Sequence, residues 1–237
     1  MIYFLTFAFL FMIGSLTGWI IELLFRRIFT AKRWINPGFL TGPCLPLYGF
    51  GLASLFLLAR IPLDFIENDT LRKIVQILIM SIVVIFIEYL TGLIFIKGMK
   101  IKLWDYSKRW GNIQGIICPL FSLFWLIVCA VYTLLIDDKI LQIANWFVNN
   151  IYYSFFVGIF AGILIIDVIH SFDIANRIKA AAKENDIVIK WETLKSSIAE
   201  YGEKLKEKVH FISPFKSERS LKEIVQNYFE EHNKTKK

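Results

Sequence analysis

The chain has 237 residues, is 56% hydrophobic and 16% aromatic, and carries 27 Lys and Arg against 20 Asp and Glu, a net charge of +7. Its mean hydropathy is +0.55, and its apolar residues occur in blocks of roughly twenty, which excludes an ordinary soluble domain and is typical of a membrane protein. The positive charge does not indicate nucleic-acid binding, because the basic residues flank the apolar blocks, where they orient spans and contact anionic lipid.

Five apolar stretches predict five transmembrane helices, so the predicted fold class is an all-α integral membrane protein. Each stretch is near the ~20 residues that cross a ~30 Å hydrocarbon core. The first lacks a basic leader and is followed directly by Arg26 and Arg27, so we interpret it as an anchor and not as a cleaved signal peptide. In chain order the predicted spans cover about residues 2–25, 43–59, 74–96, 113–136 and 151–169.

The charges of the loops predict the orientation. The loops after the first and third spans are strongly basic, with Asp105 as their single acid, whereas the loops after the second and fourth spans are mixed or acidic. Basic loops stay on the cytoplasmic side of a membrane. We therefore expect a multi-pass membrane protein with its N-terminus outside and its C-terminus in the cytoplasm.

The two basic loops share a pattern at a constant offset along the chain. The matched residues are two Trp, two Asn and two Pro: Trp34 and Trp110, Asn36 and Asn112, and Pro43 and Pro119. A Glu lies in the apolar run before each loop, Glu22 and Glu88, although at a shorter offset. We interpret the pattern as two repeated helical pairs plus one further span. A chance match is the alternative, because one sequence offers many offsets to search.

Residues 36–48 combine three prolines with four nearby glycines. Proline removes backbone donors and glycine allows close backbone approach, so this segment cannot begin as a plain lipid-facing helix. Irregular backbone at membrane depth persists only if it is buried in protein or lines a wet cavity. The segment therefore predicts either a re-entrant element or an ordinary loop followed by a short helix with proline at its start.

Two glutamates within the apolar runs are candidates for a polar site. Glu22 lies four residues before Arg26, so the simple interpretation is an ion pair across one helical turn. Glu88 lies deeper, where a carboxylate costs on the order of 3 kcal/mol unless it is protonated, paired or facing water. We therefore favour a functional role for Glu88, with a structural hydrogen bond as the alternative. Gly92, one turn later, lets a partner approach it closely.

The second basic loop completes this candidate site with Asp105, Tyr106 and Asn112, and the first loop with Asn36. Asn36 and Asn112 could line a symmetric polar site with the two glutamates. Asp105 has a simpler alternative, an ion pair with Lys108 or Arg109, and aromatic residues at an interface are usually anchors.

Asp167 and His170 form a lower-priority ionisable pair, because they share a helix face at the end of the fifth span and such pairs are more often structural. We predict no cofactor and no metal, and the weak evidence for catalysis favours a non-enzyme, because no Walker A, HExxH, nucleophile-elbow or dinucleotide pattern is present. The three cysteines, Cys44, Cys118 and Cys129, lie at or inside apolar runs, which indicates packing and not a disulfide framework.

The composition changes at residue 173, so we predict a membrane domain over residues 1–172 and a cytoplasmic helical tail over 173–237. Apolar residues between Ile187 and Leu205 alternate at spacings of four and three, which predicts a short coiled coil or a helix on the membrane face. A second amphipathic helix is predicted at about 218–229. The tail could bind a partner, dimerise or lie on anionic lipid.

The Gly-Pro-rich segment and the second basic loop together resemble a known family. The motif residues are Gly38, Gly42, Pro43, Pro46, Tyr48, Gly49 and Gly51, then Glu88, Gly92, Trp104-Asp-Tyr-Ser107, Asn112, Gly115 and Cys118. They are similar to those of a bacterial family of ABC-transporter permeases, the CmpB-like or type IV group, over about residues 14–167. The resemblance implies an inner-membrane protein with a transport function, and it brings no substrate and no functional residues.

These observations predict an integral membrane subunit of a transport system, a permease partnered with a separate ATPase. The expected partners are membrane lipid, that ATPase and a second copy of the chain, since five spans are few for a permeation path; no nucleic acid is expected. The first alternative is a scaffold or sensor that acts through its tail. The second is an intramembrane enzyme that uses Glu88 and Asp105.

Overall fold

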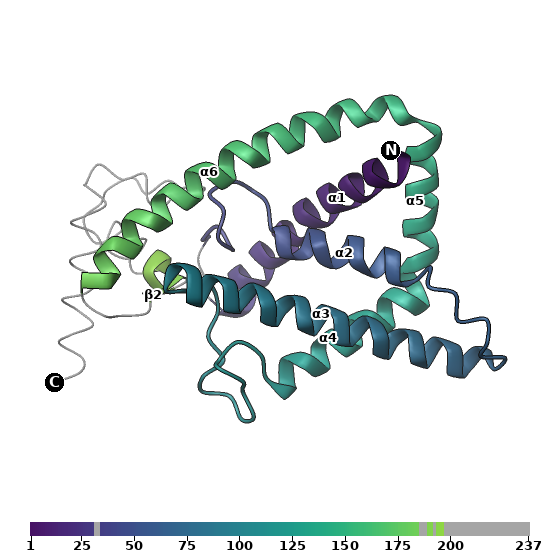
Figure 1. Cartoon of the computed structure of the whole chain (residues 1–237), viewed down its shortest axis with the longest axis horizontal. Coiled ribbons are helices and arrows are strands. Elements are labelled where there is room, and N and C mark those ends of the chain that lie inside the picture. Colours follow the sequence, from purple (N-terminus) through teal and green to yellow (C-terminus); the bar gives the residue numbers. More distant parts are fainter. Residues whose placement is uncertain (31–33, 185–188, 192, 197–237) are drawn as a thin grey trace. The chain divides into compact units, whose positions relative to one another are not determined.

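The apolar blocks of the sequence form helices in the computed structural model, which describes residues 1–30, 34–184, 189–191 and 193–196 (Figure 1). Among these residues, four helical stretches are long and apolar enough to cross a membrane: Ile2–Phe29, Asp69–Met99, Pro119–Asn149 and Ile151–Ile178. By length and hydropathy the chain is a multi-pass membrane protein. The predicted helical membrane fold is thus confirmed for four of the five spans.

The second predicted span is the exception. Its helix, α2 (Pro46–Leu58), has 13 residues, which at 1.5 Å per residue gives about 20 Å, less than the ~30 Å of a hydrocarbon core. Before it, residues 34–45 contain no helix. Most side chains of this segment are nevertheless buried, including Asn36, Leu40 and Cys44. The short helix begins at a proline because proline's missing N–H is harmless in the first turn.

Helix boundaries differ from the predicted spans for local reasons. Helix α1 (Ile2–Phe25) continues as a π-helix over Arg26–Thr30. Helix α3 (Asp69–Met99) begins earlier than predicted, because the Asn68 Oδ1 accepts the backbone N–H groups of Thr70 and Leu71 at 2.9 and 3.1 Å and so caps the helix. Helix α4 (Pro119–Val131) begins later than predicted, since residues 105–118 form an ordered loop.

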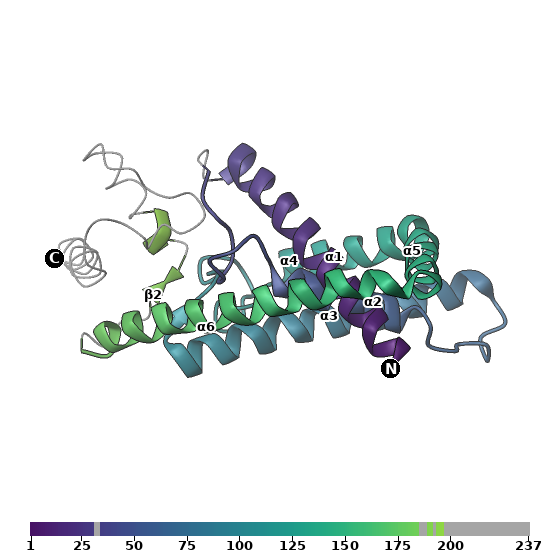
Figure 2. The ribbon, with the colours of Figure 1, turned by 90° about the horizontal axis from the view of Figure 1, so that it is seen from above.

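An additional helix follows α4, in a region that the sequence indicated only as a loop. A π-helix (Tyr132–Ile136) joins α4 to α5 (Asp137–Asn149), and α5 turns away from the axis of α4 (Figures 1 and 2). Helix α5 buries Ile140, Ala144 and Phe147, which share one face at helical spacing. The hydropathy pattern did not indicate this amphipathic helix, because its polar residues separate two apolar blocks and so suggested a loop.

A 3-10 turn (Ile151–Tyr153) leads into the last helix, α6 (Ser154–Glu184). This helix passes the predicted domain boundary at residue 173 without a break. After it, the two-residue strand β2 (Ile189–Lys190) pairs in parallel with β1 (Ile101–Lys102). The predicted all-α fold is therefore mostly helical with one small sheet. The coiled coil predicted from Ile187 is wrong at Ile189–Lys190, and its remainder beyond residue 196, like the helix predicted at 218–229, lies outside the described residues.

The chain forms two compact units that alternate along the sequence. The first unit consists of Met1–Gly18, Pro46–Gly92 and Asp105–Gly162, and the second of Trp19–Leu45, Leu93–Trp104 and the described residues from Ile163 onward. The core of the first unit includes a stack of Phe9 on Phe147, with ring centroids 4.1 Å apart. In the second unit, Phe39 contacts Phe95, Phe172 and Trp191.

Within the first unit, small residues allow α1 and α2 to pack closely. A Cβ atom on Gly49 would lie 2.6 Å from the Phe11 carbonyl oxygen, and one on Gly14 would lie 2.9 Å from the Tyr48 carbonyl oxygen. Both obstacles are backbone atoms, which cannot move aside as a flexible side chain can. The glycines of α1 thus have the packing role that small residues have between membrane helices.

Candidate functional site

Glu88 is the buried carboxylate of the first unit, with only 4% of its surface exposed. It lies on α3, one turn before Gly92, the last residue of α3 in this unit. The indole Nε1 of Trp125 on α4 donates to the Glu88 Oε2 at 2.8 Å, and the Tyr106 hydroxyl donates to Oε1 at 3.4 Å. Two neutral donors therefore solvate this carboxylate in place of water.

Tyr106 reaches Glu88 from the loop between β1 and α4, outside the membrane-spanning helices. Its ring stacks on Phe121 with centroids 4.3 Å apart and planes 10° apart, and its backbone N–H donates to the Gly115 carbonyl at 2.8 Å. Burial raises the pKa of the Tyr106 hydroxyl well above its ordinary value, and the charge of Glu88 raises this pKa further. The hydroxyl therefore stays protonated and acts as a donor to Glu88.

The same loop approaches α3 one turn after Glu88. A Cβ atom on Gly92 would overlap the side chain of Ile116, so only glycine lets the loop lie this close to the helix. From the spacing of Glu88 and Gly92 on one helix face, we predicted that another segment packs closely against the helix there. That segment is the part of the loop around Ile116.

Asp105 and Asn112 have a different role from Glu88, although they belong to the same unit. Asp105 accepts hydrogen bonds from the backbone N–H and the hydroxyl of Ser107. Asn112 donates to the carbonyl oxygens of Ser107 and Arg109 at 3.2 and 2.8 Å and accepts the Gly115 N–H at 2.9 Å. These contacts form turns within the loop. Of the predicted site residues, Tyr106 is the one whose side chain the structure places against Glu88.

Asn36 and Glu22 lie in the second unit. Asn36 is fully buried: it accepts the Trp19 indole N–H at 2.6 Å and donates to the carbonyl oxygens of Leu40 and Thr41 at 3.3 and 2.8 Å. Asn36 therefore organises its own loop, as Asn112 does. Glu22 binds the Arg26 Nε at 2.7 Å, which is the ion pair across one helical turn that the simple interpretation expected.

Asp167 binds Thr41 and Gly42 in residues 34–45, the irregular segment that precedes α2. Its Oδ1 accepts the backbone N–H and the hydroxyl of Thr41, and its Oδ2 accepts the Gly42 N–H at 3.0 Å. Ser171, one turn along α6, also accepts the Thr41 N–H at 3.0 Å. The neighbouring His170 side chain is exposed. Asp167 thus satisfies backbone donors that would otherwise be buried without partners in a segment with no helix or strand.

Two side chains that follow α6 donate hydrogen bonds to backbone carbonyl oxygens of the same segment. The Lys195 ammonium donates to the carbonyl oxygens of Asn36 and Gly38 at 3.0 and 2.5 Å, and the Trp191 indole donates to the Gly38 carbonyl at 3.2 Å. Both side chains are 1% exposed. Gly38 has a φ of +78°, a conformation that favours glycine.

Sequence reasoning missed Trp125, Lys195 and Trp191. Each joins segments that are far apart along the chain, and no pattern in a single sequence encodes such a pairing. It also missed the ion pair between the Arg60 Nη1 and the Asp137 Oδ1, 2.6 Å apart, which links the end of α2 to the start of α5. The signal available was a pair of opposite charges in two loops predicted on the same side of the membrane.

No group of three or more His, Cys, Asp or Glu residues that could hold a metal ion occurs among the residues that the structure describes. In that part of the chain Cys44, Cys118 and Cys129 are free and buried. Chemically, the site provides a carboxylate that two hydrogen-bond donors hold in place. If Trp125 and Tyr106 move away, this carboxylate can exchange a proton or bind a cation.

No curated protein and no solved structure matches the chain. A family model does match: the model described as "Putative ABC-transporter type IV" covers residues 9–172. The match includes the irregular segment, Glu88, the loop that carries Tyr106, and Asp167. Because it extends over more than half of the sequence, this chain belongs to the family that this model describes, "Putative ABC-transporter type IV".

Proposed function

We propose that the chain is the integral membrane subunit of a transport system and acts as a permease with a separate ATPase. The family and the spanning helices support a membrane role. The sequence contains no Gly-rich phosphate-binding motif of the Walker type, so on this proposal another chain hydrolyses ATP. The sequence predicts five spans, and the helix of the second, α2, is short. Because so few spans hardly enclose a permeation path, we expect assembly with a second copy or another membrane subunit.

The observation that carries the proposal is the buried carboxylate of Glu88. A carboxylate inside an apolar helix is expensive and is usually retained for a pathway or a coupling step. Trp125 and Tyr106 hold it with hydrogen bonds, and within the part of the chain that the structure describes no ion pair neutralises it. This arrangement supports a role in which Glu88 receives a proton or a cationic group during the transport cycle.

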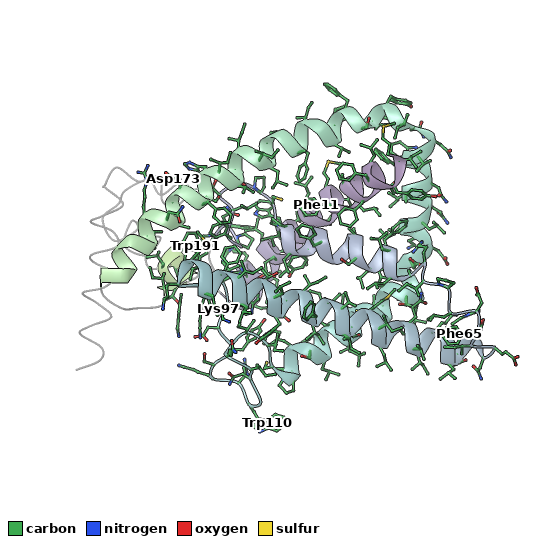
Figure 3. The ribbon with its side chains drawn as sticks, in the orientation of Figure 1. Phe11, Phe65, Lys97, Trp110, Asp173 and Trp191 are labelled. Atoms are coloured by element: carbon green, nitrogen blue, oxygen red, sulfur yellow. The ribbon has the colours of Figure 1, made fainter. Side chains whose placement is uncertain are left out.

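The loop charges support the orientation that we propose. The basic loops, which carry Trp34 and Trp110, would face the cytoplasm of a bacterial inner membrane, and the N-terminus would lie outside. In this orientation the ATPase would bind the cytoplasmic face of the chain, on the tail or on parts of the basic loops outside residues 107–113. A cysteine introduced at exposed Phe65, in the loop between α2 and α3 (Figure 3), should then react with an impermeant maleimide added to intact cells. A cysteine at exposed Lys108 should react only after the cells are permeabilised.

The experiment that tests the proposal is affinity purification of the full chain from its native membrane in mild detergent, followed by mass spectrometry. An ATPase recovered in stoichiometric amount supports a permease. Recovery of the chain without any ATPase, from membranes in which the chain is intact, contradicts it.

A scaffold or sensor is the second candidate, and a specific contact favours it. Trp191 and Lys195, in the region predicted to be a tail, are buried against the Gly38 carbonyl of the irregular segment. A signal received by the tail could therefore reach the membrane-embedded part of the chain. A soluble partner that co-purifies through residues 185–237, in place of an ATPase, would favour this role.

We propose that the protein is not an enzyme. An intramembrane enzyme would need Glu88 and Asp105 to act together, and the two carboxylates have separate partners. Glu88 binds Trp125 and Tyr106, whereas Asp105 binds Ser107.

A further inference from the structure

Residues 107–113, the tip of the loop before α4, expose an aromatic side chain beside two positive charges. Trp110 is 86% exposed and Ile113 is 52% exposed. Lys108 and Arg109 are exposed as well. Figure 3 shows the Trp110 side chain at the outer edge of the loop, pointing away from the helices. The tip therefore presents apolar and cationic groups together.

The backbone of the tip is fixed, so the exposure of Trp110 does not result from a loose loop. Asn112 donates to the carbonyl oxygens of Ser107 and Arg109, on either side of Lys108. Gly111 has a φ of +65°, and a Cβ atom there would lie 2.9 Å from the Pro119 Cγ. The tip thus rests on the first residue of α4, and its shape holds the indole outward.

The position of the tip in the chain places it at the surface of a membrane. It lies between α3 and α4, each of which belongs to a stretch that is apolar and long enough to cross a membrane. Tryptophan is enriched at the level of the lipid headgroups, where its ring meets the acyl chains and its N–H meets water. Arg and Lys beside it match the charge of anionic headgroups.

Among the described residues, no ion pair joins the acid of the loop, Asp105, to Lys108 or Arg109. The Asp105 Oδ1 accepts hydrogen bonds from the Ser107 hydroxyl and N–H, in a turn before the tip. Phosphate oxygens of a lipid are the ligands that an exposed Arg and Lys at this depth would meet.

We infer that residues 107–113 form an anchor for anionic phospholipid, in which Lys108 and Arg109 bind headgroup phosphates while Trp110 and Ile113 insert at the boundary of the acyl chains. This inference does not depend on what the protein transports. A similar combination occurs independently in the second unit, where Trp34 is 53% exposed and the Arg27 guanidinium lies 5.6 Å from the centre of its ring.

The test uses the full chain in nanodiscs and the quenching of tryptophan fluorescence by brominated lipids. The emission of Trp110 is obtained as the difference between the wild-type protein and Trp110→Phe. We expect this emission to be quenched when bromine is near the headgroup end of the acyl chains, and at least twofold more by brominated phosphatidylglycerol than by brominated phosphatidylcholine at equal content. Lys108→Gln/Arg109→Gln should remove the preference for phosphatidylglycerol.

The control variant, Lys73→Gln/Lys139→Gln, removes the same charge at two exposed positions elsewhere and should keep the preference. Equal quenching by the two lipids in the wild-type protein would overturn the inference, as would a Trp110 that neither lipid quenches. A partner protein that co-purifies with the wild-type chain, is lost from Trp110→Ala and shields the indole from lipid would also overturn it, because the tip would then be a protein interface.

Discussion

At the scale of single residues, the hydrogen bonds that Glu88 accepts should contribute measurably to the stability of the protein. Trp125 Nε1 and the Tyr106 hydroxyl both point at this one carboxylate. A buried donor that loses its acceptor costs about 1–3 kcal/mol. The carboxylate therefore connects α3, α4 and the loop, whatever further role it has in transport.

Replacing Glu88 by alanine should destabilise the protein more than replacing it by glutamine. Glu88→Ala leaves both donors without an acceptor, so we expect a loss of roughly 2–4 kcal/mol, whereas Glu88→Gln keeps one carbonyl oxygen for Trp125 and should lose about 1 kcal/mol. Thermal unfolding in nanodiscs measures the difference. The control Glu67→Ala, at an exposed position, should unfold like the wild type. Equal stability of the alanine and glutamine variants would show that these hydrogen bonds contribute little.

At the scale of elements, the packing of α1 on α2 depends on the position of glycine within one short helix. Gly49 and Gly51 are two residues apart on α2, so they point in different directions. A Cβ atom on Gly49 would meet the Phe11 backbone of α1, whereas nothing lies within 4 Å of a Cβ on Gly51 among the described residues.

Gly49→Ala should therefore destabilise the protein by roughly 1–3 kcal/mol through overpacking, and Gly51→Ala should be neutral or stabilising by up to about 1 kcal/mol because alanine favours the helix. Denaturation of the two variants in the same detergent compares them directly. If Gly51→Ala were the more damaging variant, the packing of α1 on α2 described here would be wrong.

The irregular segment, residues 34–45, is held by side chains that bind its backbone. Asp167 and Ser171 bind the Thr41 and Gly42 N–H groups, and Lys195 binds two of its carbonyl oxygens. Cys44, buried within this segment, is a natural reporter of its opening.

Lys195→Met should make Cys44 more reactive. A hydrogen bond to a charged group contributes about 1.5–3 kcal/mol, so its loss should speed maleimide labelling of Cys44 by roughly tenfold or more if labelling requires local opening. Peptide mapping by mass spectrometry distinguishes Cys44 from Cys118 and Cys129. The control Lys190→Met, at an exposed position of the same region, should label at the wild-type rate. Unchanged labelling in Lys195→Met would show that Lys195 does not hold the segment.

At the scale of the whole molecule, sequence periodicity and hydropathy predict the elements much better than the contacts between them. The long apolar runs specify helices because the membrane leaves backbone groups no other partner. The short helix α2 and the amphipathic helix α5 were missed in part, since proline, glycine and polar residues interrupt the apolar pattern there.

The same contrast applies to the candidate site: local features could be predicted from the sequence, and contacts between distant segments could not. The burial of Glu88 and the need for Gly92 beside it follow from local spacing. Trp125 does not, because it lies 37 residues away on a helix whose rotation about its own axis is set by packing. The symmetric site expected from Asn36 and Asn112 rested on the repeat alone, and each of these side chains binds the backbone of its own loop.

The central claim is that Glu88 serves a transport cycle driven by a separate ATPase, and the most direct measurement is ATP turnover by the complex purified from native membranes into nanodiscs. We predict that Glu88→Gln retains the ATPase subunit but lowers its turnover by tenfold or more, while Glu67→Gln leaves turnover unchanged. A complex that assembles with Glu88→Gln and hydrolyses ATP at the wild-type rate, with wild-type dependence on pH, would contradict the account.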